Sequence, residues 1–321
     1  MVVDLASQFV PAADEVSRLQ RGTDPECRLF QKIAEQGHYA GRTQPTNTRQ
    51  GTYAAAPNGV LLASANTNDP KRMADMLRRA LEKWNSMSKA ERLSEENPRD
   101  WASQLQRPER LYPDGGLVLR VVVRDLPRED GQRRPADWRA DAWNQDFAWF
   151  RSGEMLQLLP PSLEVGATAA LGEAAARRFA RAHLIDTVRG QSPPYGEKAI
   201  QRAALQTEAL TVTDERVRLR VTGEAFIEEE GTWAISGFQD MNNPQNRKRG
   251  VDLKMLGYAE FDRRAGRFVS FEVVALGTRW GGTQYNARAD DLAPAPIGFL
   301  LSLAEPTDRV APANWWIYGW R

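Results

Sequence analysis

The chain has 321 residues, more than one hydrophobic core usually serves, so we expect two domains. Its 43 Lys and Arg side chains nearly balance its 42 Asp and Glu side chains, and the net charge of +1 provides no general attraction to nucleic acid or to an anionic membrane. One cysteine and two histidines exclude an internal disulfide and a thiolate cluster, and they are too few for the usual zinc sites. We therefore predict no metal, no cofactor and no nucleic-acid partner.

The apolar stretches are too short to span a bilayer. The longest of them, residues 118–123, is interrupted by Arg120. The residues that follow Met1 lack the basic, apolar and small-residue regions of a secretory signal peptide. As the sequence is written we expect a cytoplasmic protein. A periplasmic or exported location is expected if Met1 is not the true start.

Residues 1–85 contain the clearest local signals. Asn58-Gly59 lies between two apolar runs, a pattern typical of a β-hairpin. Asp69 suits the N-cap and Pro70 the first position of a following helix. Apolar residues then recur at helical spacing and predict one buried face. These residues are Met73, Met76, Leu77, Ala80, Leu81 and Trp84.

The rest of the chain divides into a polar linker over 86–115 and a β-rich domain over 116–321. The linker is rich in charged residues, proline and glycine. Residues 117–123 predict a strand and residues 172–185 a helix. After Leu205, polar and apolar residues alternate with a period of two, as in half-buried strands. These strands are predicted at 217–221, 226–229, 232–236, 255–261, 268–276 and 297–303, with a hairpin loop at 262–266.

This pattern predicts an α+β chain. Short strands separated by turns are typical of an antiparallel β sandwich or barrel, here with flanking helices. The three tryptophans near the C-terminus, Trp315, Trp316 and Trp320, are expected to pack onto the barrel mouth as a plug.

Phe9-Val10-Pro11 followed by Asp14-Glu15, the hairpin around Asn58-Gly59 and the helix after Asp69 occur in the order of a known fold. On these motifs residues 1–85 resemble the C-terminal part of a thioredoxin-like domain, with Phe9-Val10 similar to its central strand. On that alignment the active-site half of the fold would precede Met1.

The resemblance implies a pair of cysteines that opens a helix and exchanges disulfides. On the alternative alignment the active-site helix opens at Asp24-Pro25-Glu26-Cys27, where Asp24 stands in place of the nucleophilic cysteine and Cys27 is the single thiol. We therefore expect a redox-inactive thioredoxin-like portion.

Two candidate catalytic groups also have structural interpretations. Cys27 falls in the first turn of a predicted helix, where a helix N-terminus lowers a thiol pKa but neighbouring carboxylates oppose that effect. It is either a half-buried helix residue or a monothiol redox site. His183 and Asp186 lie three apart on a predicted helix and would share a face, as an oriented general base requires. No Gly-x-Ser-x-Gly motif supplies a nucleophile.

A tryptophan-rich polar stretch is the candidate ligand site. Trp138, Trp143 and Trp149 alternate with polar residues that include Asp146. They predict either a stacking cleft or amphipathic core anchors. We predict a non-catalytic binding or interaction protein whose partner is an unknown small molecule or protein. The alternatives are a monothiol redox enzyme using Cys27 and a hydrolase using His183 with Asp186.

Overall fold

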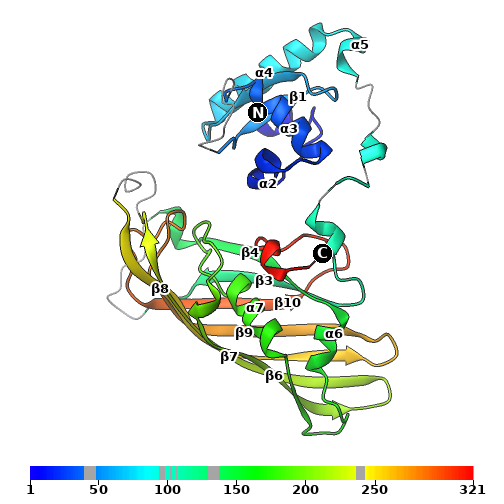
Figure 1. The fold of residues 1–321 in the computed structure, drawn as a ribbon, viewed down its shortest axis with the longest axis vertical. Helices are drawn as coiled ribbons and strands as arrows, with labels where there is room; N and C mark the ends of the chain where they lie inside the picture. The colour runs from blue at the N-terminus through cyan, green and yellow to red at the C-terminus, as the bar shows by residue number, and fades with distance from the viewer. Residues whose placement is uncertain are drawn as a thin grey trace. The chain divides into compact units, whose positions relative to one another are not determined.

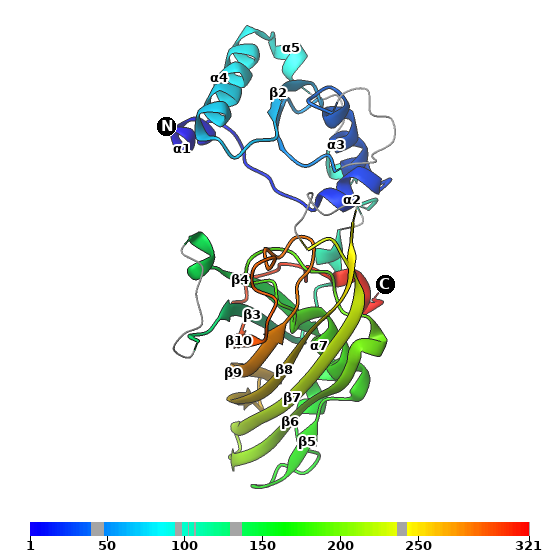
Figure 2. The same cartoon turned by 90° about the vertical axis from the view of Figure 1, so that its left-hand side faces the viewer.

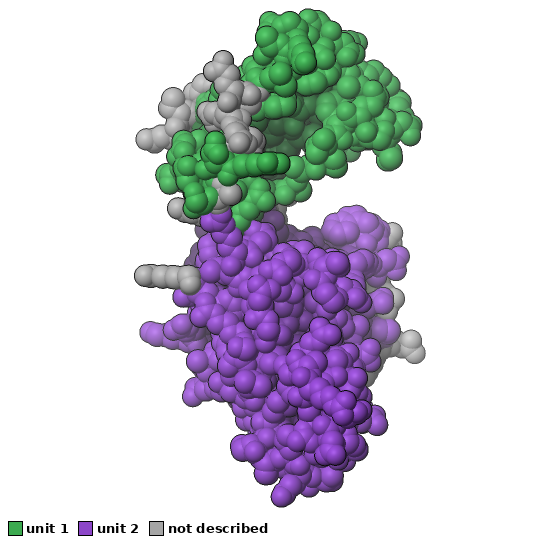
Figure 3. Space-filling view, turned by 90° about the vertical axis from the view of Figure 1, so that its right-hand side faces the viewer, with its two compact units in different colours: residues 1–107 green, residues 108–321 purple. Residues whose placement is uncertain are grey.

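The chain divides into two units, residues 1–107 and residues 108–321 (Figure 3). The boundary lies inside the segment 86–115. The computed structural model describes residues 1–39, 48–93, 98–101, 103–105, 107–128, 137–235 and 243–320. Within those ranges no helix combines the length and the apolar character needed to cross a membrane.

Unit 1 consists of short helices and a two-stranded hairpin (Figure 1). Strand β1 (Thr52–Ala55) pairs antiparallel with β2 (Leu61–Ala65), and Gly59 adopts φ +80° in the turn, so the predicted hairpin is confirmed. Helix α4 (Pro70–Ser86) packs on the hairpin, and Asp69 caps its first turn as predicted. The remaining helices are α1 (Val2–Ala6), α2 (Val16–Arg21), α3 (Pro25–Glu35), α5 (Lys89–Arg92) and η1 (Pro98–Trp101).

Phe9 and Val10 do not form a strand, so this part of the prediction is wrong. Val10 is 95% exposed, whereas a residue of a central strand would be buried. The following Pro11 also lacks the backbone donor that a central strand needs. Within the described part of unit 1, β1 and β2 are the whole sheet.

Unit 2 is built on one eight-stranded antiparallel sheet in the order β4-β3-β10-β9-β8-β7-β6-β5 (Figure 1). The predicted α+β class with an antiparallel sheet is confirmed. Because β4 and β5 are free edges, the sheet is open, and the predicted sandwich or barrel is wrong for the described residues. The strands are β3 (Leu117–Asp125), β4 (Trp143–Phe150), β5 (Thr168–Ala170), β6 (Ile200–Val212), β7 (Arg216–Trp233), β8 (Gln245–Asp262), β9 (Arg267–Trp280) and β10 (Ala295–Leu303).

Helix α7 (Glu173–His183) takes the place of a second sheet (Figures 1 and 2). Its alanines and Phe179 are buried against the inward residues of the strands in one continuous core. Small side chains let the helix approach the sheet closely, so one face of the sheet is covered without a barrel. The shorter helical segments are η2 (Pro108–Leu111), η3 (Trp138–Ala140), α6 (Ser152–Met155), η4 (Leu156–Leu158), η5 (Glu197–Ala199) and η7 (Trp315–Tyr318).

The period-two alternation is confirmed where it was strongest. Val217, Leu219 and Val221 are buried on β7, while the arginines between them face outward. The stretches predicted separately at 217–221, 226–229 and 232–236 form a single strand as far as Trp233. The loop at 262–266 joins β8 to β9 as expected.

Candidate functional site

Cys27 lies in the first turn of α3, as predicted. Its backbone N–H donates to the Asp24 carboxylate at 2.9 Å, and its thiol donates to the Arg18 carbonyl oxygen at 3.4 Å. The side chain is fully buried. Burial, and then the Asp24 carboxylate, raise the pKa of Cys27 to about 11, although the Arg18 guanidinium acts in the opposite direction. The thiol is therefore protonated at neutral pH. In this form it is a poor nucleophile, because the reactive species is the thiolate.

His183 is not oriented by Asp186, so the predicted pair is wrong. The His183 Nδ1 atom lies 2.8 Å from Asp146 Oδ2, and Nε2 lies 2.6 Å from Tyr318 Oη. Asp186 instead accepts two hydrogen bonds of 2.8 Å from Arg288. The reason is that α7 ends at His183, so the helical spacing does not extend to residue 186.

The hydrogen bonds around His183 form a closed network. Nδ1 contacts the Asp146 carboxylate, and Nε2 contacts the Tyr318 hydroxyl. That hydroxyl in turn accepts from the Trp149 backbone N–H at 3.0 Å, and the second Asp146 oxygen accepts from Ala313 N–H at 2.8 Å. The imidazole is completely buried. Because the side chain is completely buried and both ring nitrogens have partners inside the protein, the imidazole is not accessible to a substrate in this structure.

The proposed tryptophan cleft is not assembled. Trp149 is 1% exposed and packs against the C-terminal segment, whereas Trp138 and Trp143 are 64% and 54% exposed. Trp143 and Trp149 are six residues apart on β4, which separates them by about 20 Å. Asp146 is held by His183. The structure therefore does not bring the three indole rings together around one cleft.

A buried cluster of arginines and aspartates in unit 2 was missed by the sequence analysis. Arg288 is fully buried and pairs with both Asp125 and Asp186. Burial alone would raise the pKa of Asp291, but hydrogen bonds from arginines hold it well below its ordinary value. The cluster joins the ends of β3 and β9 to the loops after α7 and β9. Its members are Asp125, Arg128, Asp186, Arg189, Arg279, Arg288 and Asp291.

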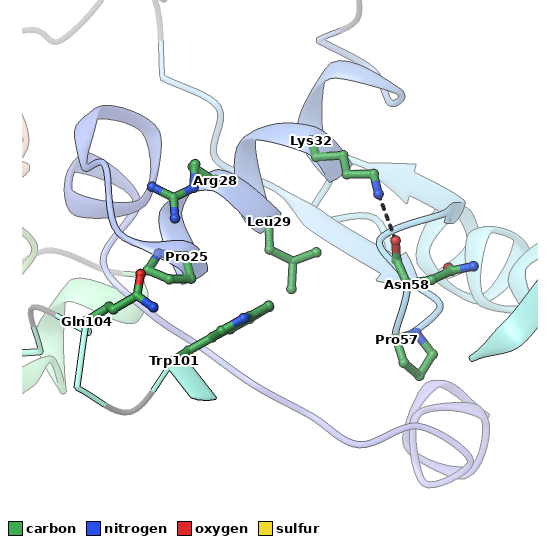
Figure 4. Close-up of a pocket in the computed structure, with 8 residues that line it drawn as sticks. All are labelled: Pro25, Arg28, Leu29, Lys32, Pro57, Asn58, Trp101 and Gln104. Atoms are coloured by element: carbon green, nitrogen blue, oxygen red, sulfur yellow. Dashed lines mark hydrogen bonds between the residues drawn. The ribbon is translucent and has the colours of Figure 1, made fainter. Parts of the chain in front are cut away.

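Unit 1 contains a pocket of about 290 Å³ beside α3 (Figure 4). Leu29 and Trp101 face one another across its middle. Arg28 lies at one end, and Lys32 lies at the other, where its Nζ donates to the Asn58 carbonyl oxygen at 2.9 Å. The complete lining is Pro25, Arg28, Leu29, Lys32, Pro57, Asn58, Trp101 and Gln104.

The lining has the composition of a site for a flat anion. Arg28 and Lys32 are one helical turn apart and share a face, and the eight lining residues include no carboxylate. Trp101 offers an aromatic face and Leu29 an apolar one. The volume lies near the lower limit for small-ligand pockets. Sequence analysis missed this site because its walls come from α3, the hairpin turn and η1, which lie far apart in the chain.

No group of three or more His, Cys, Asp and Glu side chains in the described ranges is arranged to hold a metal ion. Comparison of the chain with protein-family models, with curated proteins and with solved structures found no match. The functional interpretation therefore depends on the geometry of the sites.

Proposed function

We propose that the protein is a non-catalytic binding protein and that the pocket of unit 1 holds a small planar anion. The observation that carries the proposal is the pairing of two cations, Arg28 and Lys32, with an aromatic wall, Trp101, around one cavity. A ring bearing a carboxylate or a phosphate fits that chemistry. Its flat part stacks on the indole and its charged group meets the guanidinium.

Arg28 is the principal anchor for the anionic group. It lies on the exposed side of α3, and one of its nitrogens donates to the Thr23 carbonyl oxygen, which fixes the guanidinium at the pocket end. The planar guanidinium can still offer parallel donors to a carboxylate or phosphate. Lys32 adds positive charge while its ammonium remains tied to Asn58.

Two observations favour binding over catalysis. The Cys27 thiol is buried with a raised pKa, which disfavours a monothiol redox site. The His183 side chain is completely buried and both its nitrogens have partners inside the protein, which disfavours a hydrolase that uses this residue as its base.

We interpret unit 1 as a degenerate thioredoxin-like portion. Support comes from the order of α3, the hairpin and α4, and from the position of Cys27 in the first turn of α3. With Asp24 as the cap of that helix, the first thiol of a redox pair is replaced by a carboxylate. The pocket beside α3 would then serve ligand binding without disulfide exchange.

Calorimetric titration with two probes of the same shape tests the proposal. Indole-3-acetate carries the charge that the pocket requires, and indole-3-acetamide does not. We expect the anion to bind at least about tenfold more tightly, a difference of about 1.4 kcal/mol. Equal affinity for the two probes, or binding of neither, would contradict the proposed ligand class.

Two variants place the binding in the pocket. Arg28→Gln removes the anchoring charge and Trp101→Ala removes the stacking wall. Each should weaken the binding of indole-3-acetate by about tenfold. Lys71→Gln is the matched control, because Lys71 is an exposed cation on α4 outside the pocket lining. Binding that is insensitive to both pocket variants would place the ligand elsewhere.

A further inference from the structure

The sheet of unit 2 exposes a row of apolar side chains on the face opposite α7. Val122, Leu300, Val274 and Leu256 are cross-strand neighbours on β3, β10, β9 and β8, and we call them the apolar row. The last three are 42%, 42% and 53% exposed. Leu276, adjacent on β9, is 49% exposed and widens the row.

The apolar row departs from the pattern of the rest of that face. Beyond it the outward positions include charged residues that pair with neighbours on the next strand, as on a solvated sheet face. Lys254 pairs with Glu224 on one side, and Arg220 pairs with Glu208 on the other. Large side chains that stay half-exposed at adjacent positions on neighbouring strands are typical of an interaction surface.

We propose that this face is the contact surface of a homodimer, in which the apolar rows of two copies pack against each other. The inference concerns unit 2 and does not depend on the proposed ligand of unit 1. Two sheets stacked face to face bury such rows between them and keep their strands within about 30° of alignment.

The area of the sheet face is large enough for contact with a second copy of the chain. The six strands from β3 to β6 are spaced by about 4.8 Å, and about eight residues of each lie across the face at about 3.4 Å per residue. The face therefore offers about 800 Å² per copy, which is the contribution of one partner to a standard protein interface.

The charges beside the apolar row are complementary under a two-fold operation. Lys254 lies on one side of the row, and Glu272 lies on the other on the neighbouring strand β9. Glu272 has no ion pair with another residue in the described ranges. A two-fold axis along the row reverses the two sides, so Lys254 of one copy faces Glu272 of the other, displaced by one strand spacing along the row and by the separation of about 10 Å between stacked sheets. The lysine and glutamate side chains together span that distance.

Sedimentation equilibrium of the full chain over a wide concentration series tests the proposal. We expect a monomer–dimer equilibrium in the wild type. Val274→Lys should raise the dimer dissociation constant at least about tenfold, and Val165→Lys should leave it unchanged. Val165 is the matched control, because it is 70% exposed outside the sheet. A wild type that stays monomeric, or a dimer insensitive to Val274→Lys, overturns the proposal.

A charge exchange tests the two-fold arrangement itself. Glu272→Lys should weaken the dimer, and Glu272→Lys combined with Lys254→Glu should restore affinity relative to either single variant. Failure of the double variant to exceed both single variants overturns the arrangement. A monomer that instead binds uncharged phosphatidylcholine vesicles through Val274 would assign the face to a lipid surface and would also overturn the dimer.

Discussion

Tyr318 Oη lies 2.6 Å from His183 Nε2, although the two residues are 135 positions apart in the chain. Burial raises the pKa of Tyr318, so its hydroxyl remains protonated and can donate to the imidazole. The same oxygen accepts from the Trp149 backbone N–H on the edge strand β4. One side chain of η7 thus joins the C-terminal segment to the end of α7 and to the sheet.

Tyr318→Phe should destabilise unit 2 by about 3 kcal/mol. The substitution removes one oxygen and leaves both His183 Nε2 and the Trp149 N–H without their partner in a buried site, and each unsatisfied group costs about 1–3 kcal/mol. The free energy of unfolding from urea titrations measures the effect. Tyr112→Phe is the control, since the Tyr112 hydroxyl has no hydrogen bond to another described residue. Equal losses in the two variants would contradict the structural role of the network.

Local elements of this fold were predictable from short-range signals. Asn58-Gly59 fixed a hairpin, Asp69-Pro70 fixed a helix start, and the alternation around Leu219 fixed a half-buried strand. Each of these depends on residues within one turn or one strand, where backbone preferences act directly. Whether the sheet closed was not predictable in this way, because α7 covers the face that a second sheet would otherwise cover.

The partners of buried polar groups could not be predicted from the sequence either. His183 and Asp146 belong to separate hypotheses at the level of sequence, since nothing in their spacing joins a helix end to an edge strand. The sequence pattern contains one weak indication of the arginine–aspartate cluster. Asp125 continues the inward alternation of Val121 and Val123, which placed an aspartate on the core face at a strand end. Such a charge needs a buried partner, but the sequence does not say which one.

Asp291→Asn should destabilise the protein by about 3–5 kcal/mol, because removing one partner from a buried ionic cluster leaves the others uncompensated. Asp291 lies within 3.1 Å of nitrogens on Arg128, Arg189, Arg279 and Arg288. Chemical unfolding at neutral pH measures the loss. The adjacent Asp290 provides the control: it is exposed and pairs with Arg139, so Asp290→Asn should cost less than about 1 kcal/mol. Similar losses for both variants would show that burial of the cluster contributes little.

The same cluster predicts acid sensitivity. The pKa values of Asp125 and Asp291 are lower in the folded protein than the unfolded value of about 3.9. Between these values the unfolded chain binds more protons, so the stabilisation is present above about pH 4 and is lost as the pH falls further. Urea midpoints of the wild type should therefore fall steeply below about pH 4, and those of Asp291→Asn less steeply. Parallel pH profiles would contradict this assignment.

Gly277→Ala should destabilise the sheet by about 1–3 kcal/mol through overpacking. A Cβ at this position on β9 would lie 1.9 Å from the Asp252 carbonyl oxygen and 3.0 Å from Leu253 Cα, both on the backbone of β8. The two strands would have to separate. Gly153→Ala in α6 meets no atom within 4 Å and should be neutral or slightly stabilising. Thermal unfolding of both variants measures the difference in stability. A Gly277→Ala variant as stable as the wild type would show that the strands separate at little cost.

Alkylation of Cys27 separates the binding interpretation from the monothiol alternative. With a pKa of about 11 in the folded protein, the thiol should react with iodoacetamide far more slowly than in the denatured chain, where the value is about 8.5. Because the folded pKa is the higher one, the corresponding stabilisation is present below about pH 8.5 and is lost as the pH rises toward 11. Rates measured from neutral to alkaline pH, with Cys27→Ser as the blank, test both statements. Rapid modification of the folded protein below pH 7 would require an activated thiolate. That result would support the monothiol redox alternative for unit 1.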